Sequence, residues 1–246
     1  MLGTAAAVSS RLIAAAMPPS CLACGMPVAD EGGLCAGCWG RLRLIERPFC
    51  DKLSIPFSYD LGAGALSAEA IANPPPFDRM RAVALYDGVA RELVHALKYG
   101  DHLEIAQWMA GWMHRAGAEI IADADLIVPV PLFRRRLWSR RFNQAAALVA
   151  AIAKRAGKPY ALSAVTRIRR TENQVGLTRK ARQANVRGAF RVDEAHRPQI
   201  AGRRVLIVDD VATTGATLGA VTRSLGRAGA AGVDALVFAR VAHEAI

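Results

Sequence analysis

From residue 80 onward, unbroken apolar runs alternate with segments of helical periodicity. The runs are AVALY (82–86), LIVPV (126–130), VLIV (205–208) and DALVFARV (234–241). Apolar residues repeat at i, i+3 and i+4 within residues 90–97, 105–112, 145–152 and 218–225. Strands that lack polar alternation are buried on both faces, as in parallel sheets covered by helices. The pattern predicts an α/β fold with a parallel sheet, whose ligands would bind beyond the carboxyl ends of the strands.

The size and charge of the chain limit what it can be. It has 246 residues, of which 52% are hydrophobic, so one α/β domain with a small appendage can bury a sizeable core. No apolar run is long enough to cross a bilayer, and residues 1–20 lack the basic start of a signal peptide, so we expect a short leading helix and a cytoplasmic protein. The net charge of +11 favours an anionic partner: nucleic acid, an acidic membrane face or a phosphorylated small molecule.

Four cysteines stand in two close pairs near the amino terminus, and ten residues separate the pairs. They are Cys21, Cys24, Cys35 and Cys38. Zn²⁺ accepts four thiolates in a closed, structural site, so this spacing predicts a zinc ribbon. Two disulfides are the alternative, but they would require export to an oxidising compartment, and we expect no export signal in this chain. An iron–sulfur cluster is the weaker metal alternative.

Composition divides the chain into three parts. Residues 1–50 hold all five cysteines and form the expected zinc-ribbon unit with its leading helix. Residues 51–77 are rich in Gly, Ser, Ala and Pro and end in three consecutive prolines, a stiff connector. We therefore expect boundaries at 1–50, 51–79 and 80–246, with the α/β domain last.

The segment VLIVDDVATTGAT (205–217) places two acids and a loop of small residues after an apolar run. We expect the strand to run out at residue 208 and a helix to occupy residues 218–225. Unpaired N–H groups and the dipole at a helix start attract anions, glycine allows close approach, and hydroxyls donate hydrogen bonds. The residues expected to bind a phosphate monoester are therefore Thr213, Thr214, Gly215, Ala216 and Thr217.

Asp209 and Asp210 need a separate explanation, because carboxylates repel phosphate. Two neighbouring acceptors suit the vicinal hydroxyls of a ribose, and they can also bind a divalent cation. Phosphate on the loop and a diol on the acids together describe a ribose 5-phosphate unit. The alternative is an acidic turn before an ordinary threonine-capped helix.

This segment resembles the phosphoribosyl-pyrophosphate (PRPP) motif of type I phosphoribosyltransferases. KYGD (98–101), VPVPL (128–132), RRFNQ (140–144), TENQ (171–174) and NVRGAF (185–190) stand in the order seen in the ComF/GntX family, named after a bacterial competence protein required for DNA uptake. The resemblance covers nearly the whole chain. It implies a type I phosphoribosyltransferase-like domain that binds PRPP with Mg²⁺ and uses Asp209 and Asp210 as catalytic residues. It does not specify the acceptor substrate.

The chain departs from the family pattern in its second cysteine group. Family members often carry a second quartet, whereas this chain keeps only Cys50 and has Leu53 at the expected partner position. We expect no second metal site and an ordinary, half-buried Cys50 thiol. Residues 51–79 are then a linker or a metal-free remnant of a second ribbon.

Two basic segments stand between the predicted strands 126–130 and 205–208, and the first directly follows a strand. In FRRRLWSRRFNQ (133–144), Arg134 and Arg140 are expected to bind diphosphate, because a guanidinium pairs with phosphate oxygens in a bidentate manner. A solvated basic helix face is the alternative, and Arg141 replaces a glycine that the family usually has.

By resemblance, residues 167–191 correspond to the loop that closes over a phosphoribosyltransferase site. Phe190 is its only aromatic residue, which argues against a groove that stacks nucleic-acid bases. A disordered basic loop is the third alternative.

Two functional hypotheses remain open at this stage. In the first, the protein binds PRPP or a related ribose 5-phosphate and is a phosphoribosyltransferase (a pentosyltransferase, within the glycosyltransferases) for an unknown acceptor. In the second, the fold is a non-catalytic factor in DNA uptake or processing that binds single-stranded DNA, while the zinc ribbon docks a DNA-uptake helicase. Single-stranded DNA binding would show a steep dependence on salt, and PRPP binding would depend on the two aspartates.

Overall fold

The computed structural model describes residues 19–29, 32–99, 103–132, 143–169 and 179–242. The predicted leading helix in residues 1–18 therefore lies outside the described residues. So do Arg134 and Arg140, predicted to bind diphosphate, and residues 170–178 of the predicted closing loop.

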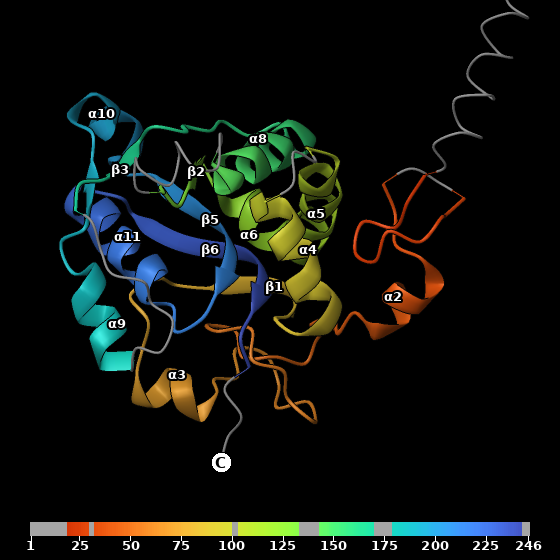
Figure 1. Cartoon of the computed structure of the whole chain (residues 1–246). Helices are drawn as coiled ribbons and strands as arrows, with labels where there is room; N and C mark the ends of the chain where they lie inside the picture. Colours follow the sequence, from red (N-terminus) through yellow and green to blue (C-terminus); the bar gives the residue numbers. More distant parts are fainter. Residues whose placement is uncertain (1–18, 30–31, 100–102, 133–142, 170–178, 243–246) are drawn as a thin grey trace, which may run out of the picture.

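A four-stranded parallel sheet forms the centre of the molecule (Figure 1). Its strands lie in the order β1 (Met80–Leu85), β6 (Gly232–Arg240), β5 (Arg204–Ala212) and β2 (Leu126–Pro129). All neighbouring strands pair in parallel. The prediction of a parallel sheet made from four apolar runs is confirmed, and the two longest strands occupy its middle.

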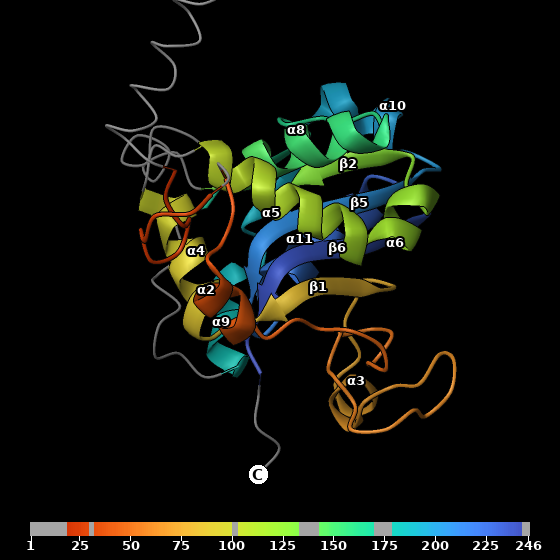
Figure 2. The ribbon, with the colours of Figure 1, turned by 90° about the vertical axis from the view of Figure 1, so that its right-hand side faces the viewer.

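Helices cover both faces of the sheet, as the unbroken apolar runs require. One face carries α4 (Gly88–Tyr99), α5 (Leu103–Ala116), α6 (Ala118–Asp123) and α8 (Gln144–Ala156), and α11 (Ala216–Arg227) lies on the other (Figure 2). Successive residues of β5 enter opposite cores: Leu206 packs on the four-helix side and Ile207 on the α11 side. Each such side chain contributes about 1.5–3 kcal/mol when fully buried.

The strand that carries the two aspartates is longer than predicted. β5 continues through residue 212 instead of ending at residue 208, and its pairing with β6 runs on to Ala212 opposite Arg240. The prediction that the strand runs out before Asp209 is therefore wrong. Aspartate disfavours strands, but the long neighbouring strand supplies backbone partners that outweigh this preference. α11 also begins earlier than expected, so Ala216 and Thr217 lie in its first turn.

Several short elements were not predicted from periodicity. β3 (Val165–Arg167) and β4 (Phe190–Val192) form a separate antiparallel pair, and α9 (Arg179–Val186) precedes β4. A 3₁₀ turn (Glu194–His196) and α10 (Arg197–Ile200) lead into β5. The carboxyl half of the predicted closing loop is thus a helix and a strand, held to the α11-side core by Val186 and Phe190.

The amino-terminal region packs against the edge of the sheet. α2 (Ala36–Arg41) belongs to the cysteine-rich segment, and Trp39 on it contacts Trp112 of α5 with ring centroids 4.8 Å apart. Downstream, Ile45 N–H donates to the carbonyl of Val83 at 2.8 Å. This short pairing covers the free edge of β1, which would otherwise expose unpaired backbone groups.

Residues 46–77 pack on the α11 side of the sheet and include α3 (Ala68–Ala72). Cys50 is completely buried there, and its Sγ accepts a hydrogen bond from the N–H of Ser67 at 3.2 Å. The expectation of a half-buried thiol is therefore wrong, because Cys50 joins Leu53 in the main core. No helix in the described part of the chain combines the length and the apolar character needed to cross a membrane.

Candidate functional site

Asp209 and Asp210 lie near the carboxyl end of β5, just before the loop to α11. Adjacent strand residues point to opposite faces, yet the negative charge of Asp210 is close enough to influence the ionisation of Asp209. The N–H of Asp210 also donates to Oδ1 of Asp209 at 2.9 Å. Two acidic groups are thus held in contact at the edge of a parallel sheet, where ligands of such folds bind.

Lys98, from a distant part of the sequence, forms an ion pair with one of these two carboxyl groups. It lies in the last turn of α4, and its Nζ is 2.7 Å from Oδ2 of Asp210. Both side chains are mostly buried, so the ion pair is poorly screened by solvent. The sequence pointed to Lys98 only as part of the KYGD motif and gave it no role, because nothing in its spacing shows that α4 ends beside β5.

The two carboxyl groups do not ionise independently. Burial raises the pKa of Asp209 well above its ordinary value, and the negative charge of Asp210 raises it further. The N–H of Asp210 and the charge of Lys98 act in the opposite direction but do not cancel these effects. The pair therefore retains a proton at a pH where isolated carboxyl groups have lost theirs. Strongly perturbed carboxyl groups of this kind are frequent at functional sites.

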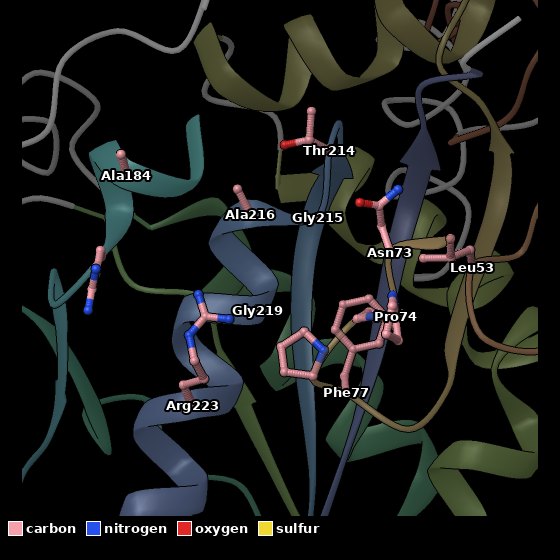
Figure 3. Close-up of a pocket in the computed structure, with 13 residues that line it drawn as sticks. Leu53, Asn73, Pro74, Phe77, Ala184, Thr214, Gly215, Ala216, Gly219 and Arg223 are labelled. Atoms are coloured by element: carbon pink, nitrogen blue, oxygen red, sulfur yellow. The ribbon is translucent and has the colours of Figure 1, made fainter. Parts of the chain in front are cut away.

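The loop after the aspartates leads into a helix start that no side chain caps. Gly215 precedes α11 in the left-handed conformation (φ 71°), and no side chain caps the helix. The hydroxyl oxygen of Thr214 is buried and has no hydrogen-bond partner among the described residues. Figure 3 shows Thr214, Gly215 and Ala216 together at the start of α11. Uncapped amides at the positive end of a helix dipole favour an anion such as phosphate.

The structure brings the predicted carboxylates and the predicted phosphate loop to one edge of the sheet. Asp209, Asp210 and residues 213–217 form one continuous segment there, and Lys98 joins them. The assignment of ligands to these residues stays a prediction.

The four cysteines of the amino-terminal segment come together as metal ligands do. Their Sγ atoms all lie within 4.8 Å of one another, and Sγ of Cys24 is 3.7 Å from Sγ of Cys35. Zinc–sulfur bonds of about 2.3 Å in a tetrahedron place sulfur atoms about 3.8 Å apart. Backbone N–H groups also point at sulfur: Cys35 N–H donates to Cys21 at 3.3 Å, and Cys38 N–H donates to Cys35 at 3.4 Å.

The electrostatics of the cluster require a positive charge. Burial and the neighbouring thiols raise the pKa of Cys38 to about 12. Burial also raises the pKa of Cys21, but backbone hydrogen bonds outweigh it and lower the pKa to about 6. Four thiolates in such contact need a cation among them, and Arg41 Nη2, 3.4 Å from Sγ of Cys38, reaches only one side. The donor set fits a structural zinc ion.

Two domain families match this chain. The double zinc ribbon domain family matches residues 12–70, and the phosphoribosyl transferase domain family matches residues 143–246. The first match contains all four clustered cysteines and Cys50, and the second contains both aspartates and the loop before α11. The type I phosphoribosyltransferase-like fold and the ribbon predicted from the sequence are thus confirmed.

Curated relatives match along most of the chain. DNA utilization protein YhgH of Escherichia coli K12 is 32% identical over 225 residues, which cover 89% of this chain and 95% of that protein. The same protein of Salmonella typhi is 33% identical over 226 residues, with the same coverage. Competence protein F of Haemophilus influenzae is 28% identical over 204 residues, covering 81% of this chain and 86% of that protein.

Solved structures with similar folds are more distant. Glutamine PRPP amidotransferase of B. subtilis is 19% identical with a TM-score of 0.36; the match covers 58% of this chain and 30% of that one. Orotate phosphoribosyltransferase of Aeropyrum pernix is 19% identical with a TM-score of 0.34, covering 61% of this chain and 76% of that one.

Proposed function

Because the chain belongs to the ComF/GntX family, which includes DNA utilization protein YhgH and competence protein F, we propose that it binds PRPP or a related ribose 5-phosphate at the end of β5. One observation carries this proposal: two adjacent carboxyl groups, one of them paired with Lys98, directly precede an uncapped helix start at the same sheet edge. These two features suit the two ends of a sugar phosphate, its diol and its phosphate.

The ligand is oriented by charge. The 5-phosphate would accept hydrogen bonds from the amides and hydroxyls of Thr213–Thr217, where the α11 dipole is positive. The ribose hydroxyls would face Asp209 and Asp210, with Lys98 holding Asp210 in place at 2.7 Å. The diphosphate of PRPP would extend toward Arg134 and Arg140. Mg²⁺, held with the ligand near the aspartates, would neutralise charge on the departing diphosphate.

Transfer to an acceptor would break the bond between C1 of the ribose and the diphosphate oxygen. The bonding electrons leave with the diphosphate, and positive charge develops on the ribose ring before the acceptor adds to C1. Asp210 and an ionised Asp209 would stabilise that charge by electrostatic attraction. No residue in the described part of the site is assigned as the base for the acceptor, so the acceptor class stays open.

Isothermal titration with PRPP and Mg²⁺ tests this proposal. The wild-type protein should bind saturably, and the double variant Asp209→Asn, Asp210→Asn should lose at least about 100-fold in affinity, which is about 2.7 kcal/mol. Asp125→Asn is the matched control, because Asp125 accepts the N–H of Arg204 at the opposite end of β5 and an amide oxygen can replace it. No saturable binding by the wild type, or equal loss in the control, would refute the proposal.

A second candidate function is single-stranded DNA binding in DNA uptake or processing, with the zinc ribbon docking a helicase. The net charge of +11 and the names of the relatives favour it. Fluorescence anisotropy with a labelled single-stranded oligonucleotide should then show affinity that falls steeply with salt. Binding should be unchanged in the double aspartate variant, since those carboxyl groups would take no part in contacts with the DNA backbone. An affinity indifferent to salt would contradict this function.

A further inference from the structure

A pocket of about 490 Å³ lies beside α11, separate from the two aspartates. It is enclosed by α11, by the end of α9 and by the proline segment, residues 73–77 (Figure 3). Thr214, Gly215 and Ala216 line one end of it, whereas Asp209 and Asp210 are not part of its lining. Its volume is in the range that holds a drug-sized ligand.

Two arginines give this pocket its charge. Arg223 comes from α11 and Arg187 from the turn after α9, and both line the pocket. Within the described residues, no carboxylate pairs with either guanidinium group. Partial burial lowers the pKa of Arg223, and the positive charges of Arg227 and Arg187 lower it further. Repulsion between cations that converge on one pocket would be relieved by an anion bound between them.

The opposite wall of the pocket is apolar and rigid. It consists of Leu53 and Pro74–Phe77, and Figure 3 shows Pro74 and Phe77 across the pocket from Arg223. Gly219 sets the distance between the walls, because a Cβ atom at this position would lie 3.1 Å from the ring of Pro76. Proline rings present flat apolar surfaces whose backbone is already constrained, so a planar ring can pack there at little entropic cost.

We propose that this pocket binds a small phosphorylated compound with a planar ring. The phosphate would lie between Arg187 and Arg223, and the ring would pack on the proline wall. The pocket shares Thr214, Gly215 and Ala216 with the loop before α11, so its ligand would also alter the affinity of that loop for a sugar phosphate. This coupling rests on the proposed function, whereas the pocket itself does not.

Phenyl phosphate is a suitable probe, because it has a phosphate and a planar ring but no ribose. In isothermal titration at low salt, the wild-type protein should bind phenyl phosphate at least tenfold more tightly than inorganic phosphate. The double variant Arg187→Ala, Arg223→Ala should lose at least tenfold in affinity for phenyl phosphate. Arg227→Ala is the matched control, since Arg227 lies one turn further along α11 and does not line the pocket. Thermal melting of each variant reports whether it is folded.

The outcomes separate this pocket from the ribose-phosphate site. The Asp209→Asn, Asp210→Asn protein should still bind phenyl phosphate, as should the wild type saturated with PRPP. The proposal is overturned if phenyl phosphate does not bind, if it binds no better than inorganic phosphate, or if PRPP displaces it completely. It is also overturned if the Arg187→Ala, Arg223→Ala protein binds phenyl phosphate normally, or if these arginines affect only single-stranded DNA. Failure of PRPP to bind would refute the proposed function and leave this test intact.

Discussion

The cysteine cluster and the aspartate pair both crowd groups of the same charge, but they are neutralised differently. In the ribbon, four thiols lie within 4.8 Å of one another, and Arg41 Nη2 contacts Sγ of Cys38. At the end of β5, Lys98 pairs with Asp210 and burial favours a retained proton on Asp209. We therefore expect the ribbon to need a bound cation to fold, whereas the carboxyl groups of the aspartate pair need no bound ion in the free protein. This difference is the one expected between a structural site and the ligand-binding site proposed here.

Loss of one ribbon thiol should have the largest effect. Cys38→Ser removes one of four ligands from a site that contributes folding free energy directly, so the purified protein should lose its single zinc ion. Cys50→Ser is the matched control, because Cys50 is equally buried but lies in the main core. Elemental analysis of both proteins measures this. Zinc retained at one equivalent by Cys38→Ser, or lost from Cys50→Ser, would contradict the assignment.

Asp209→Asn should separate stability from binding. An amide cannot carry charge, so it removes the cost of burying a second carboxylate beside Asp210, and the melting temperature at pH 7 should rise. The same change should lower PRPP affinity at least about 30-fold, because an amide cannot ionise and so cannot supply the negative charge that the proposed function assigns to Asp209 in the complex. Calorimetry and titration on one preparation give both numbers. A protein that is both less stable and fully able to bind would show that Asp209 is structural.

Lys98→Met should weaken PRPP binding more modestly, by about tenfold. Without its cation, Asp210 loses a partner at 2.7 Å and the pair resists ionisation more strongly, so less negative charge faces the ribose. Lys154→Met is the control for the loss of one positive charge, because Lys154 lies on the exposed surface of α8. Equal affinities in the two variants would mean that Lys98 does not position the aspartates.

The smallest expected effect is on the pH dependence of stability. The folded protein keeps the Asp209 proton to a higher pH than the unfolded chain, because its pKa is raised. Stability should therefore fall as pH rises from about 4, the ordinary carboxyl value, toward the raised pKa, and then level off. Asp209→Asn should flatten this part of the profile and Asp125→Asn should not. Chemical denaturation between pH 4 and 9 measures the slope; an identical slope in Asp209→Asn would contradict the pKa assignment.

The sequence predicted the features that depend on local pattern. Four apolar runs became the four parallel strands, since strands buried on both faces cannot alternate. The spacing of the cysteines predicted their cluster, because short loops bring such pairs together. The helix after residue 215 was predicted from its apolar face, although its first turn was missed.

Features that depend on distant contacts could not be predicted. β5 extends through Asp209 and Asp210 because β6 continues beside it, which no local propensity indicates. Lys98 reaches Asp210 only because α4 ends at the same sheet edge. The proline segment was interpreted as a connector, and only the fold places it against α11 as one wall of a pocket.

The central claim is that the aspartate pair contacts the ribose hydroxyls while the loop before α11 binds the phosphate. Titration with ribose 5-phosphate and 2-deoxyribose 5-phosphate, each with Mg²⁺, tests it directly, since the two ligands differ by one hydroxyl group. The wild type should prefer the ribose compound by at least about tenfold, or about 1.4 kcal/mol, and the double aspartate variant should not distinguish them. Equal affinity of the wild-type protein for both compounds would contradict the claim.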